Sequence, residues 1–120
     1  MSEVISFIDS KTIKGLSDAE IIGIKKEDYQ YDYRKKNPIR NSLTIVLDAK
    51  SAMCSTFVKE IILYNYKIID GKIDFINAWW FSANIIECNK KKRLKLLYRC
   101  PNLKIAEITI SFDEIRMITD

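Results

Sequence analysis

Alternation of apolar and polar residues is the clearest pattern along this chain. Leu43, Ile45 and Leu47 occupy every second position of one run, and a similar run covers residues 106–112. Because successive side chains of a strand point to opposite faces, this spacing predicts strands with one buried face. The same reasoning predicts strands over residues 4–8, 29–33, 43–48, 56–69, 78–81, 84–88, 93–99, 106–112 and 115–118.

Residues 64–76 contain the strongest turn signal. Asp70-Gly71 separates two runs rich in strand-forming residues. An Asp-Gly pair suits a two-residue type I′ turn, which needs positive φ at both positions. The predicted hairpin pairs Ile68 with Ile73.

A second hairpin is predicted between residues 84–88 and 93–99, joined by a four-residue loop at 89–92. With that loop, Ile85 lies opposite Leu96, and both belong to the apolar face of the hairpin.

A helical signal precedes these strands. Ser17 and Glu20 have the spacing of a capping box, and Leu16 and Ile21 have the spacing of its hydrophobic staple. The motif predicts a short helix over residues 18–26.

Residues 49–63 fit two interpretations. Helical spacing links Met53 and Phe57, whereas residues 56–69 are rich in strand formers. We expect a loop or a single turn over 49–54, followed by a long strand. The predicted fold class is therefore α+β and mainly antiparallel β, with a curved sheet or small β-sandwich and one or two short helices.

Composition indicates one globular domain over residues 1–120. At 48 % hydrophobic and 30 % charged residues the chain can bury a core, and its three glycines leave no room for a glycine-rich phosphate loop. The first residues lack a basic region before an apolar run, no stretch of about 18 apolar residues exists, and the three cysteines are an odd number. We therefore expect a cytoplasmic protein with reduced cysteines and no membrane span.

Familiar catalytic and metal-binding motifs are missing from the sequence. There is no histidine, which removes imidazole bases and ligands, and the cysteines lack Cys-x-x-Cys spacing. The adjacent pairs Glu27-Asp28 and Asp113-Glu114 would point to opposite faces of a strand rather than into one pocket. We therefore expect a non-catalytic protein without a cofactor or bound metal, whose cysteines are small buried hydrophobes.

One candidate interaction surface combines tyrosines with carboxylates. Tyrosine offers a rigid amphipathic side chain and is enriched at protein interfaces. The expected partner-binding residues are Glu27, Asp28, Tyr29, Tyr31, Asp32 and Tyr33. The alternative interpretation is that the tyrosines are half-buried sheet residues whose hydroxyls reach solvent.

A second candidate surface is the segment 90–104, which holds seven basic residues and no acid. Clustered cations neutralise phosphates, and aromatic side chains nearby can stack on unpaired bases. The nucleic-acid-binding residues would be Lys90, Lys91, Lys92, Arg93 and Arg99. A lysine-rich turn that keeps a sheet edge from aggregating is the simpler interpretation.

The run Ala78-Trp79-Trp80-Phe81 also allows two interpretations. Aromatic bulk on both faces is typical of a central strand covered on both sides, and one of the tryptophans is then only partly covered. The alternative is a stacking platform or the wall of a ligand pocket. We favour the core strand, because burying an aromatic ring contributes about 1.5–3 kcal/mol.

These observations favour a non-catalytic binding protein. The most concrete hypothesis is a small cytoplasmic inhibitor of the immunity-protein kind, which neutralises a toxic enzyme such as a nuclease by protein–protein contact. The net charge of +4 argues against it, since an inhibitor of a nucleic-acid enzyme is expected to be acidic. The second hypothesis is a nucleic-acid-binding module that uses residues 90–104. The third is a histidine-free enzyme or a binder of small apolar ligands.

Overall fold

The computed structural model describes residues 3–5, 19–32, 37–48, 58–72, 76–88 and 91–119. All regular elements within these ranges are β-strands. In chain order they are β1 (Glu3–Ile5), β2 (Glu20–Asp32), β3 (Asn37–Asp48), β4 (Val58–Tyr64), β5 (Lys67–Asp70), β6 (Ala78–Cys88), β7 (Lys91–Arg99), β8 (Ile105–Phe112) and β9 (Glu114–Thr119). The described ranges include no helix long and apolar enough to cross a membrane.

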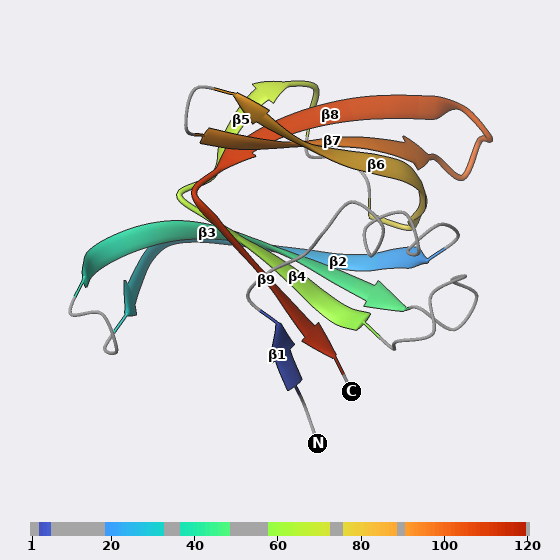
Figure 1. Ribbon diagram of the computed structural model, residues 1–120. Helices are drawn as coiled ribbons and strands as arrows, with labels where there is room; N and C mark the ends of the chain where they lie inside the picture. Colours follow the sequence, from blue (N-terminus) through green and yellow to red (C-terminus); the bar gives the residue numbers. More distant parts are fainter. Residues whose placement is uncertain are drawn as a thin grey trace.

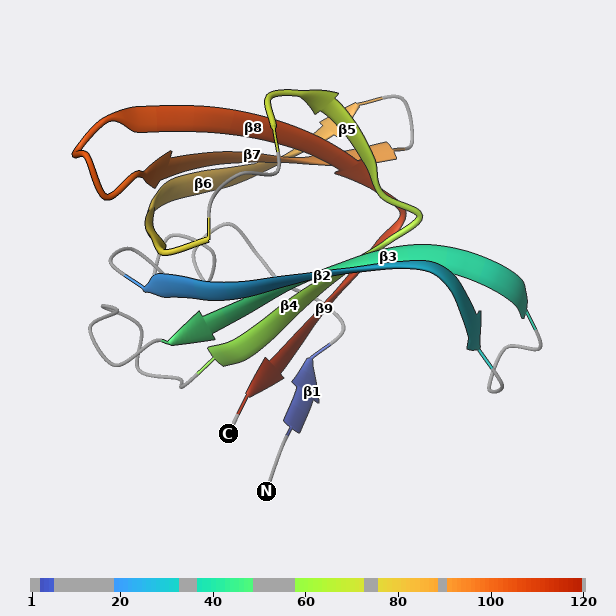
Figure 2. The same cartoon turned by 180° about the vertical axis from the view of Figure 1, so that it is seen from behind.

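The strands form one antiparallel sheet that folds over on itself. Its order is β1-β9-β4-β3-β2-β6-β7-β8-β5, and every pairing is antiparallel. Figure 1 shows two layers, with β1, β9, β4, β3 and β2 below and β6, β7, β8 and β5 above. The same layers are seen from behind in Figure 2.

One junction between the layers is a short pairing of β2 with β6. Only Glu20 with Trp79 and Ile21 with Ala78 form register pairs. The backbone N–H of Trp80 donates to the carbonyl oxygen of Ala19 at 2.8 Å, which continues the contact by one step. Beyond this point the two strands diverge into different layers.

The other junction is a corner where the chain crosses between layers twice. β4 leads into β5 through Asn65, whose φ is +52°, and β8 leads into β9 through Asp113. The backbone N–H of Asp113 donates to the carbonyl oxygen of Tyr64 (3.0 Å). The side-chain amide Nδ2 of Asn65 donates to the Asp113 carboxylate (2.7 Å). These bonds hold the two crossings side by side.

The hydrophobic core lies between the layers. The predicted alternation is confirmed on β3, where Leu43, Ile45 and Leu47 are all buried, and on β8, where Ile108 and Ile110 are buried. Each such side chain contributes about 1.5–3 kcal/mol by leaving water. The largest fully buried side chains are Trp80, Phe112, Ile21, Leu43, Ile45, Ile61, Leu63, Leu94 and Leu96.

The predicted helix over 18–26 is wrong, because Glu20 begins β2 and residues 20–26 are extended. Ile21 pairs with Leu47 and is completely buried. Burial of β-branched side chains in the sheet outweighs a local capping signal. The predicted fold class is therefore confirmed only as mainly antiparallel β, since the described ranges contain strands and no helix; residues 49–57 lie outside them.

The predicted type I′ turn at Asp70-Gly71 is wrong, because Gly71 has a positive φ and Asp70 does not. The partner of β5 among the described strands is β8. Ile68 lies opposite Ile110 and packs against the core. Residues 73–75 lie outside the described ranges. Gly71 nevertheless has a φ of +91°, and a Cβ placed there would lie 2.5 Å from the carbonyl oxygen of Glu107. The glycine is required by its close approach to β8.

The β6–β7 hairpin is confirmed, with a different register. Ile85 lies opposite Leu94, and Cys88 lies opposite Lys91. Lys91 and Lys92 therefore belong to β7, and the predicted four-residue loop at 89–92 is wrong. A shift of two residues leaves every side chain on its predicted face, so the apolar pattern could not reveal the error.

The aromatic run on β6 is covered on one face. Trp80 is fully buried, Trp79 is half-buried and Phe81 is exposed. The prediction of one partly covered tryptophan is confirmed, whereas cover on both faces is wrong. A bulge between Trp80 and Ser82 turns this part of β6 at the rim of the layer.

Candidate functional site

The far ends of β2 and β3 form a ribbon that extends beyond the rest of their layer. β3 pairs with β4 only from Ser42 to Val46, and β2 pairs with β6 only at Glu20 and Ile21. Residues 28–32 and 37–40, which we call the β2–β3 arm, therefore pair only with each other among the described strands. Figures 1 and 2 show this ribbon curving away from the two layers.

The arm contains most of the predicted partner-binding residues. Asp28, Tyr29, Tyr31 and Asp32 lie on its β2 strand, and Glu27 lies at its base with an exposed side chain. Tyr33 lies outside the described residues. The structure thus brings five of the six candidates to one projecting element.

Basic residues share this ribbon with the acids. Arg40 on β3 is the register partner of Gln30, which stands between Asp28 and Asp32 on β2. Over residues 25–40 the sequence contains six basic and three acidic residues. The arm itself, residues 28–32 and 37–40, holds Asp28, Asp32 and Arg40, so it carries both signs of charge with one more acid than base.

The base of the arm is tied to the layer by a weak ion pair. The Lys25 ammonium lies 3.8 Å from a carboxylate oxygen of Glu60 on β4, and the lysine side chain is largely exposed. An exposed pair of this kind contributes little to stability. Its sequence neighbour Lys26 is exposed as well.

The basic residues of the second predicted surface lie on opposite faces of β7. Leu94, Leu96 and Tyr98 point into the core, so Arg93 and Arg99 lie on the outer face of the β6–β7–β8 layer. Lys92 has the same parity as Leu94 and is the register partner of Glu87, so it belongs to the other face. Lys91 begins β7, and Lys90 lies outside the described residues. Only Arg93 and Arg99 of the five candidates are placed on one face.

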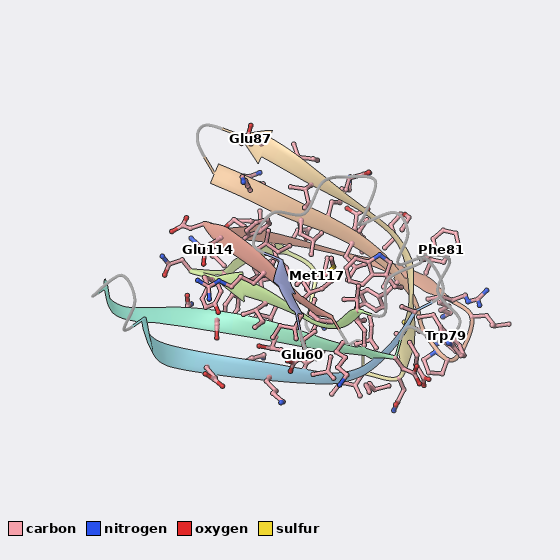
Figure 3. All side chains as sticks on the ribbon, turned by 60° about the horizontal axis from the view of Figure 1, so that its bottom comes forward. Glu60, Trp79, Phe81, Glu87, Glu114 and Met117 are labelled. Atoms are coloured by element: carbon pink, nitrogen blue, oxygen red, sulfur yellow. The ribbon has the colours of Figure 1, made fainter. Side chains whose placement is uncertain are left out.

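The β6–β7 pairing brings this basic strand next to the aromatic run. Trp79 is the register partner of Arg99, and the guanidinium carbon lies 5.4 Å from the centre of a Trp79 ring. Figure 3 shows Trp79 and Phe81 near each other at the curved end of β6. The predicted hairpin register did not place Trp79 opposite Arg99. The observed register does, and it brings the aromatic run and the basic segment together.

Lys95 also lies on this outer face, where its ammonium is 3.6 Å from a carboxylate oxygen of Glu107 on β8. Both side chains are well exposed, so the pair is weak and screened by salt. The cross-strand contact lowers the positive charge at the middle of β7, whereas Arg93 and Arg99 lie on either side of it along the strand.

The remaining chemical candidates have structural partners. Asp113 accepts the hydrogen bond of Asn65, and a carboxylate oxygen of Glu114 lies 3.1 Å from Nε of Arg116. The thiol of Cys100 is free and half-buried against the core, while the Cys54 and Cys88 side chains lie outside the description. Within the described ranges, no three Cys, Asp or Glu residues group in a way that could hold a metal ion.

No family model, no curated protein and no solved structure matches this chain.

Proposed function

We propose that the protein is a non-catalytic binding protein that occupies another protein through its β2–β3 arm. The observation that carries this proposal is that residues 28–32 and 37–40 leave the layer as a two-stranded ribbon. A ribbon of two strands is marginally stable by itself in water, so contact with a partner would stabilise it. Tyr29 and Tyr31 on this ribbon supply the residue type that contributes most to interface contact area.

The specific form that we propose is an inhibitor of the immunity-protein kind, acting on a toxic enzyme such as a nuclease. Glu27, Asp28 and Asp32 would face the basic cleft of such an enzyme. The proposal places the complex in the cytoplasm, where a free thiol such as that of Cys100 stays reduced.

Capture of the partner from the native cell tests this proposal. Tagged wild-type protein should retain one protein, identified by mass spectrometry, and purified captured enzyme should lose activity at a one-to-one ratio. The double variant Tyr29→Ala/Tyr31→Ala should release it. Phe81→Ala is the matched control, since it truncates an exposed aromatic side chain on the other layer.

If Tyr29→Ala/Tyr31→Ala retains the partner and Phe81→Ala releases it, the partner binds the β6–β7–β8 layer and not the arm. A captured enzyme that keeps full activity in the complex would leave a binding protein but rule out the inhibitor.

A further inference from the structure

The outer face of the β6–β7–β8 layer gathers basic and aromatic side chains at a distance from the arm. Three cations alternate along β7, the middle strand of this face, and aromatic or aliphatic side chains flank them on β6 and β8. We call this surface the aromatic–basic face. It consists of Trp79, Phe81, Ile86, Arg93, Lys95, Arg99 and Ile105.

Three large apolar side chains are exposed on this face. Phe81 is 44 % exposed, Ile86 47 % and Ile105 53 %. Ile86 is the register partner of Arg93, and Ile105 is the register partner of Arg99. Each arginine therefore has an exposed apolar neighbour on the next strand, an arrangement suited to a ligand with both charge and flat apolar surface.

Arg99 has an unused hydrogen-bond donor on this face. Its Nε is buried, and no group in the described part of the chain accepts from it. Buried donors in folded proteins nearly always have an acceptor, because an unpaired donor is destabilising. The guanidinium is held over the Trp79 ring, and because Nε is shielded from solvent, the terminal Nη groups rather than Nε would meet an incoming phosphate oxygen.

We propose that the aromatic–basic face binds single-stranded nucleic acid. Arg93 and Arg99 are six residues apart on one strand, which spans roughly 20 Å and allows each to meet a different phosphate of one strand. Trp79 lies against Arg99, and Phe81 is exposed two residues further along β6; both rings would stack on unpaired bases, which a duplex does not offer. The charge agrees with this ligand: residues 90–104 contain seven basic residues and no acid, and Glu107 across the strand already pairs with Lys95. A folded protein with an acidic patch would satisfy the cations but would leave the stacking surface without a specific use.

Fluorescence anisotropy with labelled twelve-nucleotide RNA and DNA tests the proposal. Wild-type protein should bind the single strands at micromolar or lower concentration at physiological salt, and should bind the matching duplex at least about tenfold more weakly. Arg93→Gln/Arg99→Gln should weaken binding and reduce the slope of log affinity against log salt by about 1.4, since each phosphate contact on a single strand contributes about 0.7. Phe81→Ala should weaken binding about tenfold and leave the salt slope unchanged.

Lys26→Gln/Lys59→Gln is the matched control, because it removes the same charge from exposed positions of the other layer. It should keep nearly all of the affinity. Arg93→Gln alone, which leaves Arg99 and its buried Nε in place, should still reduce the salt slope by about 0.7. This single variant keeps the proposal testable if the double variant unfolds.

The proposal is overturned if wild-type protein does not bind single strands, if duplex binds as tightly, or if the control loses as much affinity as the double variant. The proposal is also overturned if Tyr29→Ala/Tyr31→Ala loses nucleic-acid binding while Arg93→Gln/Arg99→Gln and Phe81→Ala keep it. That result would show that the arm binds the nucleic acid. Neither result depends on whether the arm binds a protein.

Discussion

Each layer of this sandwich carries an arginine stacked over an aromatic ring on its outer face, and the two pairs differ in what surrounds them. On the β4–β9 layer the Arg116 guanidinium lies 5.2 Å from the centre of the Tyr64 ring, and its Nε donates to Glu114 at 3.1 Å. On the β6–β8 layer Arg99 lies 5.4 Å from a Trp79 ring, and its buried Nε has no acceptor in the described part of the chain. The first arginine has a carboxylate on its own strand, and the second does not.

The residues around the two arginines also differ in burial. Next to Arg116, Tyr64 is buried, and the polar residues Ser42 and Thr44 on β3 are buried as well. Next to Arg99, apolar side chains are exposed instead. The Arg116 pair has a carboxylate partner and a buried ring and so contributes to the fold, whereas the Arg99 pair has an unpaired Nε and a half-buried ring beside exposed apolar side chains, which leaves part of its surface for a ligand.

The largest expected effect is a difference in stability between variants of the two aromatic rings, Tyr64 and Trp79. Tyr64→Ala should lower the free energy of unfolding by about 3 kcal/mol, because it opens a cavity at a buried position. Trp79→Ala should lower it by about 1 kcal/mol, since this ring is only half-buried and its truncation leaves little cavity. Chemical denaturation of both variants measures the difference. Equal losses would show that the two outer faces are equally structural.

A somewhat smaller effect tests how β5 is held on the β6–β8 layer. Gly71→Val should lower the free energy of unfolding by about 2 kcal/mol or more, because a side chain at φ +91° meets the backbone of β8. Gly23→Ala is the matched control, since its Cβ would lie an ordinary 3.5 Å from Val46 Cβ. It should be neutral or stabilising. An unchanged denaturation midpoint for Gly71→Val would contradict the pairing of β5 with β8.

The arm variants should change binding kinetics and leave stability nearly untouched. Neutral isosteres at Glu27, Asp28 and Asp32 should slow association with the captured partner, because they weaken electrostatic steering. Alanine at Tyr29 or Tyr31 should speed dissociation by about tenfold or more. Surface plasmon resonance separates the two rates. A tyrosine variant with unchanged dissociation would remove the arm from the interface.

The smallest effect concerns the cysteines, which we predict to be reduced. Thiol titration of the native protein should label at most one of the three quickly, with all three reacting after denaturation. Cys100 is the candidate for that fast reaction, because it is half-buried rather than fully enclosed. Three fast thiols would contradict the expected burial of the cysteines, and a disulfide in freshly prepared protein would contradict the proposed cytoplasmic location.

Sequence patterns predicted the strands whose burial follows strict alternation, such as β3 and β8. They failed at Ser17–Glu20 and at Asp70-Gly71, where a local capping or turn signal competed with burial of Ile21 and Ile68 in the sheet. Local signals contribute about 1 kcal/mol, and burial of an isoleucine contributes more.

The candidate surfaces required information that alternation does not contain. The contact between Trp79 and Arg99 depends on the β6–β7 register, and a shift of two residues hides it while leaving the apolar pattern intact. The arm depends on where the pairings of β3 with β4 and of β2 with β6 end, which no local pattern records. Sequence reasoning therefore found the residues of both surfaces but not their neighbours.

The contrast between the two arginines is tested most directly by measuring Arg99→Gln and Arg116→Gln side by side for unfolding free energy and for affinity to the twelve-nucleotide single strand. We expect Arg116→Gln to lose about 1–2 kcal/mol of stability, because a charged hydrogen bond and a ring contact disappear, and to keep its affinity. Arg99→Gln should change stability by less than about 0.5 kcal/mol and should lose most of its affinity. An Arg99→Gln protein that is as destabilised as Arg116→Gln and binds the strand like wild type would contradict the assignment of one pair to the fold and the other to a ligand.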